Sequence, residues 1–85
     1  MNKAAERLKK RIENTEKALD AYYEAEIAIV GGAQSYSVGS RSLTRANLAE
    51  IRKNITALEN LLANLESQLN GRGRNRMIKG IPIDS

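Results

Sequence analysis

A seam of aliphatic side chains in the second half of the chain constrains the fold more than any other feature. Its members are spaced three and four residues apart, which places them on one face of an α-helix. They are Leu48, Ile51, Ile55, Leu58, Leu62, Leu65 and Leu69. Leu61 widens this face. A helix of about residues 45–70 with so continuous an apolar face needs a partner of similar length.

The first part of the chain offers that partner as a second helix, over about residues 3–30. Residues that suit one helical face recur there at similar spacing: Ala5, Leu8, Ile12, Thr15, Leu19, Tyr22 and Ile29. Gly31-Gly32 should end this helix, because glycine tolerates the left-handed conformation common at helix C-termini. Both helices would be about 40 Å long. Equal helices with a compact connection are expected to pack antiparallel. A coiled coil between chains is the alternative.

The stretch SYSVGSRSLT, residues 35–44, predicts a β-hairpin over about residues 34–43. Gly39-Ser40 fits a two-residue type II′ turn, which needs glycine at its first central position. In this register Tyr36 faces Leu43 and Val38 faces Arg41 on one side of the ribbon. The other side carries Ser35, Ser37 and Ser42. Two strands alone are marginally stable, so the apolar side should pack on the helices.

The connection from the hairpin to the second helix carries a helix-start signal. Thr44 is a suitable N-cap, and Leu43 can contact Leu48 as a hydrophobic staple. Asn47 stands where a capping box would have Glu, so we expect no capping box.

These features predict an α+β fold, in which two long antiparallel α-helices enclose a two-stranded antiparallel β-hairpin, within residues 1–70. Gly71 should stop the second helix, and residues 71–85, GRGRNRMIKGIPIDS, change character. We interpret them as a basic and apolar arm that becomes ordered on an acidic or polar protein surface. Contact with DNA and simple disorder are the alternatives. The candidate docking residues are Arg72, Arg74, Arg76, Met77, Ile78, Lys79, Ile81, Pro82 and Ile83.

Composition removes most chemistry from consideration. The chain has 85 residues and a net charge of +4, with neither Cys nor His. Disulfides, zinc fingers and histidine acid–base catalysis are therefore excluded. No nucleophile stands beside a plausible base and there is no P-loop, so we expect no catalytic, cofactor-binding or metal-binding residues. The longest apolar run, Ile27 to Val30, is too short to span a membrane. We expect a soluble cytoplasmic protein without a membrane partner.

Two charged clusters allow more than one interpretation. An acidic stripe lies on the first helix at Glu13, Glu16, Asp20 and Glu24. We favour a solvated face, or pairing with Arg45 and Arg52 of the second helix, over a metal site or a surface for a basic partner. The N-terminal cations are Lys3, Arg7, Lys9, Lys10 and Arg11. We favour solvated charge for them over nucleic-acid binding, because acidic residues intervene and no aromatic residue lies within either basic stretch to stack on bases.

The order helix, ribbon, helix and basic C-terminus resembles the gpW-like head-completion proteins of tailed bacteriophages. The resemblance rests on GGAQSYSVGSRSLTRANLAEIRKNI and on the spaced arginines after Asn70. It implies a structural protein that joins the DNA-filled head to the tail. Its partners would be the portal protein ring, neighbouring copies of itself, a downstream neck or tail connector, and packaged DNA in the channel. It would occupy the virion neck, and the host cytoplasm during assembly.

In that family the flexible C-terminus is needed for activity, which carries over most directly to Arg72, Arg74 and Arg76. The arginines here alternate with Gly and Asn, and the tail ends in IPIDS without an aromatic residue. The serine side of the hairpin is a candidate contact between neighbouring subunits, because small side chains permit close approach. The alternatives to a phage connector are a small basic DNA-binding protein and a dimeric coiled-coil adaptor.

Overall fold

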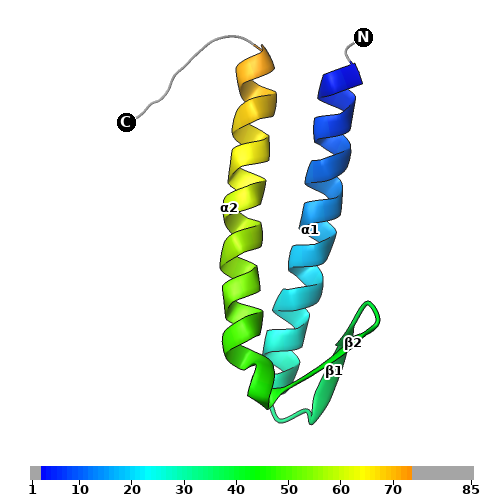
Figure 1. Cartoon of the computed structure of the whole chain (residues 1–85), viewed down its shortest axis with the longest axis vertical. Coiled ribbons are helices and arrows are strands. Elements are labelled where there is room, and N and C mark those ends of the chain that lie inside the picture. Colours follow the sequence, from blue (N-terminus) through cyan, green and yellow to red (C-terminus); the bar gives the residue numbers. More distant parts are fainter. Residues whose placement is uncertain (1–2, 74–85) are drawn as a thin grey trace.

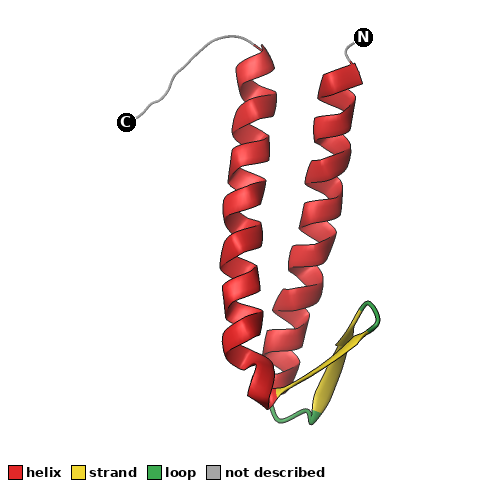
Figure 2. Ribbon diagram, viewed as in Figure 1, coloured by secondary structure: helices red, strands yellow, loops and turns green. Residues whose placement is uncertain are grey.

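The computed structural model describes residues 3–73 as two antiparallel helices with a hairpin between them (Figure 1). Helix α1 (Lys3–Val30) is followed by strands β1 (Ser35–Val38) and β2 (Arg41–Thr44), a short 3-10 helix η1 (Arg45–Asn47) and helix α2 (Leu48–Gly73). The hairpin lies beside the lower half of α1, and the start of α1 and the end of α2 lie at the opposite end of the helix pair (Figure 2). The expected α+β fold is confirmed.

Helix α1 ends in a Schellman motif at the predicted glycine pair. Gly32 has a positive φ of 115°. The N–H of Ala33 donates to the carbonyl of Ala28 at 2.9 Å, and the N–H of Gly32 donates to Ile29 at 3.1 Å. These are the two hydrogen bonds that define the motif. The reversal of the chain after α1 is therefore encoded locally, by a residue without a Cβ.

The hairpin has the predicted register. Tyr36 pairs with Leu43 and Val38 with Arg41, and the two strands are antiparallel. Gly39 has a φ of +62°, as the first central position of the turn requires. The side chain of Leu43 is completely buried, and Tyr36 and Val38 pack around the same core. The ribbon is therefore held on the helices through its apolar side.

The core is concentrated at the hairpin end of the helix pair. The buried cluster there consists of Leu19, Ala25, Ile29, Leu43, Ile51 and Ile55. Towards the other end, Leu8, Thr15 and Leu65 are also buried between the helices. The Thr15 hydroxyl donates to the carbonyl of Arg11 at 2.7 Å, so this buried polar group is satisfied within its own helix. The seam of α2 is thus used within the chain, against α1.

Two local predictions are wrong. Helix α2 does not stop at Gly71 but continues to Gly73. Gly71 is exposed and free of close contacts, so it weakens the helix without imposing a turn. A capping box is also present, since the backbone N–H of Thr44 donates to Oδ1 of Asn47 at 2.8 Å. The first turn after Thr44 is a tight 3-10 turn, which lets the shorter Asn side chain replace Glu.

Candidate functional site

The outer side of the hairpin presents the predicted serine surface. Ser35, Ser37 and Ser42 are all exposed, and Ser37 is paired with Ser42 across the ribbon. Within residues 3–73, each strand pairs only with the other, so both ribbon edges keep unpaired backbone groups. Small side chains beside free edges allow a second backbone to approach closely. The serine side therefore stays a candidate contact between neighbouring subunits.

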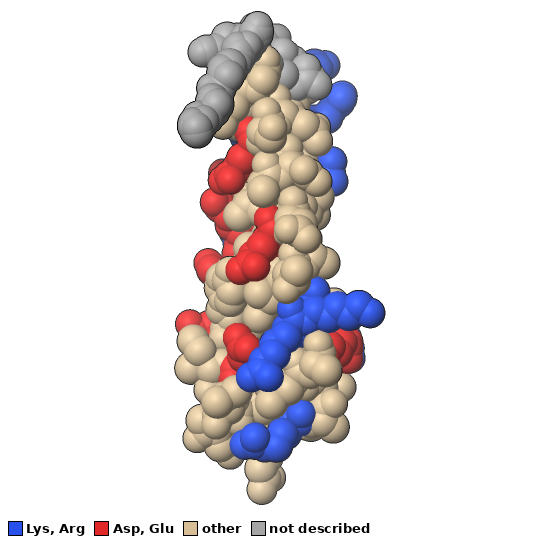
Figure 3. All heavy atoms as spheres, turned by 90° about the vertical axis from the view of Figure 1, so that its left-hand side faces the viewer, with Lys and Arg blue, Asp and Glu red and all other residues tan. Residues whose placement is uncertain are grey.

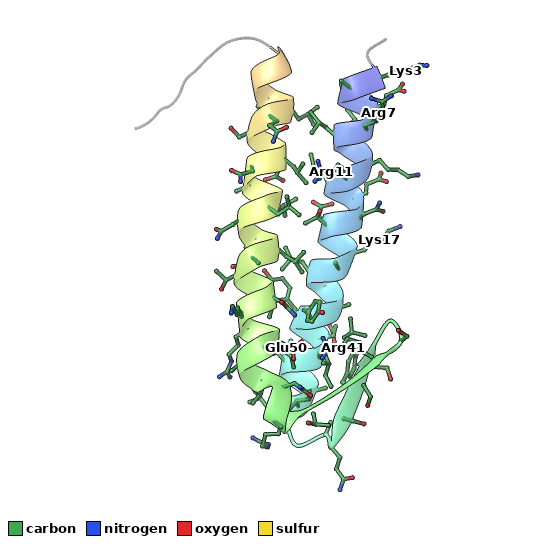
Figure 4. The ribbon with its side chains drawn as sticks, in the orientation of Figure 1. Lys3, Arg7, Arg11, Lys17, Arg41 and Glu50 are labelled. Atoms are coloured by element: carbon green, nitrogen blue, oxygen red, sulfur yellow. The ribbon has the colours of Figure 1, made fainter. Side chains whose placement is uncertain are left out.

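An ion pair fixes the hairpin to α2. The guanidinium of Arg41 on β2 donates two hydrogen bonds to the carboxylate of Glu50, and the two side chains point toward one another in Figure 4. The hydrogen bond from Arg41 lowers the pKa of Glu50 below its ordinary value, and the same bond raises the pKa of Arg41. Two hydrogen bonds between the same guanidinium and carboxylate restrict their relative orientation more than a single bond would. This contact links the ribbon to α2 in addition to the apolar packing of Leu43.

Of the two interpretations favoured for the acidic stripe, the pairing with Arg45 and Arg52 is wrong. Arg52 bonds Glu26 instead, with Nε 2.7 Å from Oε2. Arg45 donates to the carbonyl of Ile29 at 3.2 Å, beside the C-terminal end of α1, where the helix dipole attracts a cation. The stripe residues are exposed and make no ion pair within the described residues: Glu13, Glu16, Asp20 and Glu24. No group of side chains able to hold a metal ion occurs in residues 3–73.

An apolar stripe near the end of α1 was missed by the sequence reasoning. Tyr23, Ile27 and Val30 are 36%, 66% and 52% exposed, and their spacing of four and three residues places them on one face. The Tyr23 hydroxyl donates to Oε2 of Glu59 on α2 at 2.6 Å, and this bond raises the pKa of Tyr23 above 10.0. The spacing of these residues could have revealed a shared helical face. Only their exposure in the structure shows that this face is not the one packed in the core.

The N-terminal cations do not form one cluster in the structure. Lys3, Arg7 and Lys10 follow one line along α1, and Lys17 continues it about two turns further on. Lys3, Arg7 and Lys17 leave α1 on the side turned away from α2 (Figure 4). Lys9 falls on a different face, by the same helical geometry. We call Lys3, Arg7, Lys10 and Lys17 the basic stripe. All four are exposed, and none forms an ion pair within the part of the chain that the structure describes.

The candidate docking arm cannot be placed against these surfaces. Arg72 belongs to the last turn of α2, but its side chain is not described. The other candidate residues lie outside the described residues: Arg74, Arg76, Met77, Ile78, Lys79, Ile81, Pro82 and Ile83. Because α2 continues to Gly73, residues 71–73 of the predicted arm belong to the helix.

Comparison with known proteins places the chain in a family. A family model matches residues 1–85, the whole of the chain. The family is DUF6148, described as a family of unknown function. The chain belongs to this family. No curated protein and no solved structure matches it. Nothing in these matches links DUF6148 to the gpW-like proteins, so that resemblance stays a hypothesis.

Among residues 3–73, neither helix combines the length and the apolar character needed to cross a membrane.

Proposed function

We propose that this protein is a structural connector of a tailed bacteriophage, which joins the DNA-filled head to the tail without catalysing a reaction. Copies would dock as a ring beneath the portal and form the platform for the next connector protein. The observation that carries the proposal is the hairpin, which is seated on the helix pair through Leu43 while its serine side stays exposed. The resemblance to the gpW-like proteins supplies the biological setting.

The architecture suits an adaptor that works through its surfaces. The helix pair is joined along its length by buried aliphatic side chains, and Arg41 bound to Glu50 fixes the ribbon at one end. A body built in this way can present a ribbon to one neighbour and its helix faces to others. The arm after Gly73 adds arginines and aliphatic residues that suit a groove on a partner protein.

The decisive experiment measures binding of the purified protein to the isolated portal ring of its own phage or prophage. The full chain is compared at moderate salt with a chain truncated after Gly73, which keeps all of α2. Binding by the full chain alone indicates a connector that docks through its arm. Binding by both the full and the truncated chain indicates a connector that docks through its folded body.

Failure of both chains to bind the portal ring would contradict the proposal. If the full chain then shifts duplex DNA in a gel, and the shift disappears steeply between low and moderate salt, the protein is instead a small DNA-binding protein. A stable dimer that binds neither would favour the adaptor alternative.

The serine surface has a test of its own. Replacing Ser37 and Ser42 by Glu places like charges at paired positions on the exposed side, where a packed neighbour would have to bury them. We expect at least a tenfold loss of assembly on the portal with an unchanged helical circular dichroism signal. Loss of the helical signal would show instead that the serines support the fold.

A further inference from the structure

One flank of the helix pair is acidic in its upper part and apolar toward the hairpin. In the upper half of Figure 3, Asp and Glu gather on one side, opposite Lys and Arg. On α1 this flank carries Glu16, Tyr23, Ile27 and Val30, whose spacing of seven, four and three residues keeps them on one face. All four are exposed. A chain that runs along α1 in the direction of the hairpin therefore meets acidic residues first and apolar residues second.

Helix α2 contributes carboxylates to the same flank. Glu59 accepts the hydrogen bond from Tyr23, so these two residues mark one level of the antiparallel helices. Glu66 follows one heptad later, and Gly73, the last residue of α2, follows one heptad after Glu66. The helix therefore ends on the face that carries both carboxylates, and the arm of residues 74–85 begins there.

An open hollow lies close to the point where the chain leaves α2. It is lined by Ile12, Glu66, Leu69 and Asn70, and Gly73 comes three residues after Asn70. An Arg or Lys side chain can lay its methylene groups on Ile12 and Leu69 while its charge approaches Glu66. The start of the flank is thus suited to the basic residues that come first in the arm.

The basic residues of the arm occur at the intervals of the carboxylates. An extended chain advances about 3.3 Å per residue, so Arg76 can reach about 10 Å from Gly73 and Lys79 about 20 Å. Helix α2 rises about 1.5 Å per residue, which puts Glu66 about 10 Å and Glu59 about 21 Å from the same point. Each of the two cations therefore reaches the level of a carboxylate.

The apolar residues of the arm occur at the interval of the apolar surface. Measured from the end of α2, with Tyr23 level with Glu59, the exposed Ile27 and Val30 lie about 27 and 32 Å along the flank. An extended arm can bring Ile81 to about 26 Å and Ile83 to about 33 Å. Charge and apolar character thus follow the same order in the arm and on the flank.

Two cations also lie on this flank, and the arm accommodates their positions. Lys9 lies at the level where the arm begins, before the first carboxylate. Arg52, one heptad before Glu59, bonds Glu26 and lies about 31 Å from the end of α2. The acidic Asp84 of an extended arm would reach about 36 Å, close to this level. Beyond Lys9, the charges of the arm are therefore complementary to those of the flank.

We propose that residues 74–85 fold back along this flank of their own chain. The basic part of the arm then lies against the carboxylates of α2, and its isoleucines cover the exposed Ile27 and Val30. In the proposed connector, this contact would hold the arm on the body until the portal displaces it. That consequence rests on the proposed function, but the contact itself is argued from this chain alone.

The chain's own arm suits the flank better than other occupants do. It starts on the same face, so its effective concentration at the flank is high without any association between molecules. Three exposed apolar side chains are too few for a stable dimer, which needs about 20–30 residues on each partner. The carboxylates of the flank would repel the phosphates of a nucleic acid.

The test places a spin label at the end of the arm and measures which amide signals it broadens in an NMR spectrum. The chain contains no Cys, so Ser85→Cys gives a single attachment point. A docked, extended arm carries the label to the hairpin end of the flank, and the amide signals of Ile27 and Val30 should lose intensity at least twofold. An undocked arm keeps the label on average about 20 Å from Gly73. The strongest loss would then fall at the start of α1, which would overturn the proposal.

Two double variants show whether the apolar surface holds the arm. Ile27→Gln with Val30→Gln changes exposed positions, so circular dichroism should show an unchanged fold, and the strongest broadening should move to the start of α1. The matched control, Lys10→Gln with Lys17→Gln, changes two exposed residues on another face of α1 and should leave the broadening as it is in the unaltered chain. Equal broadening in the two double variants would contradict the proposed contact.

Mixing separates docking on the same chain from docking on a second copy. A spin-labelled chain at natural isotope abundance is mixed with an isotope-enriched chain that carries no spin label. If the signals of Ile27 and Val30 broaden in this mixture, the arm docks on a neighbouring molecule and the proposal is wrong. Broadening that occurs only within the labelled chain and is unchanged on dilution supports it.

The measurement contains no portal protein, so the two proposals can fail separately. Broadening at Val30 without binding to the portal ring would keep the docked arm and remove the connector. Portal binding without this broadening would keep the connector and overturn the docked arm.

Discussion

At the scale of single residues, the backbone conformation of a few glycines determines where the chain turns. Gly32 and Gly39 have positive φ values, and neither has any atom near the position of a Cβ. A side chain at either position would therefore be opposed by backbone strain and not by crowding. Gly71 is different, because it lies within α2 with open space around it. Glycine therefore favours the fold at Gly32 and Gly39, where the backbone needs a positive φ, and weakens it at Gly71, where the backbone is helical.

Replacing Gly32 by Ala should lower the free energy of unfolding by about 1–2 kcal/mol, because alanine resists the positive φ of the Schellman motif. The matched variant is Gly71→Ala, which should raise it by up to about 1 kcal/mol, since alanine is the better helix former. Urea denaturation followed by circular dichroism measures both. Equal effects of the same sign would contradict the assigned conformations.

At the scale of elements, the hairpin is attached to the helices by the buried Leu43, by Tyr36 and Val38 packed against the same core, and by one ion pair. Leu43 enters the core, and Arg41 on the same side of β2 reaches Glu50. The ion pair is exposed, so its contribution depends on the charge of Glu50 and on salt. The lowered pKa of Glu50 shows in which direction this contribution changes with pH. A carboxyl group with a lowered pKa in the folded state stabilises the fold above its ordinary pKa of 4.5, and this contribution disappears as the pH falls through the folded value.

We therefore expect the stability of the unaltered chain to fall toward that of Glu50→Gln as the pH is lowered from 7 to 3. Urea denaturation at several pH values measures the difference between the two curves, which should be small because the pair is exposed. Glu24→Gln, an exposed carboxylate without an ion pair in residues 3–73, is the matched control and should parallel the unaltered chain. A constant difference between Glu50→Gln and the unaltered chain would contradict the predicted effect.

At the scale of the whole molecule, one small core has to hold three elements together. The cluster at the hairpin end combines Ala25 and Ile29 of α1, Leu43 of β2, and Ile51 of α2. A core in a chain of this size supplies only about 3–5 kcal/mol. Removing a residue that all three elements share should therefore unfold the molecule as a unit.

Replacing Leu43 by Ala should cost about 2–5 kcal/mol, since it deletes a completely buried side chain. That loss is comparable with the whole stability, so both helices should lose their circular dichroism signal in one transition at or near room temperature. Ile27→Ala removes an exposed side chain of similar size and should change stability by less than about 0.5 kcal/mol. A stable helix pair in Leu43→Ala would show that the hairpin is an independent attachment.

Much of the fold was predictable because its signals are local. The spacing of Ile51, Ile55 and Leu65 determined the core face of α2, and Gly32 and Gly39 determined the two turns. The hairpin register followed from the turn position and from the alternation of serine with apolar residues. The end of α2 was not predictable in this way, since a glycine weakens a helix without stopping it.

The candidate surfaces depended on tertiary structure, because they join residues from different elements. Arg52 pairs with Glu26 and Arg45 with the end of α1, and these partners follow from the packing offset between the helices. The helical spacing had placed the completely buried Ile29 on the packing face, but it gave no role to Ile27, which is 66% exposed. The sequence by itself therefore determined the elements, their turns and the register of the ribbon. Only the tertiary structure decided which charges share a flank and which apolar residues stay exposed, because both depend on the way the helices and the ribbon pack together.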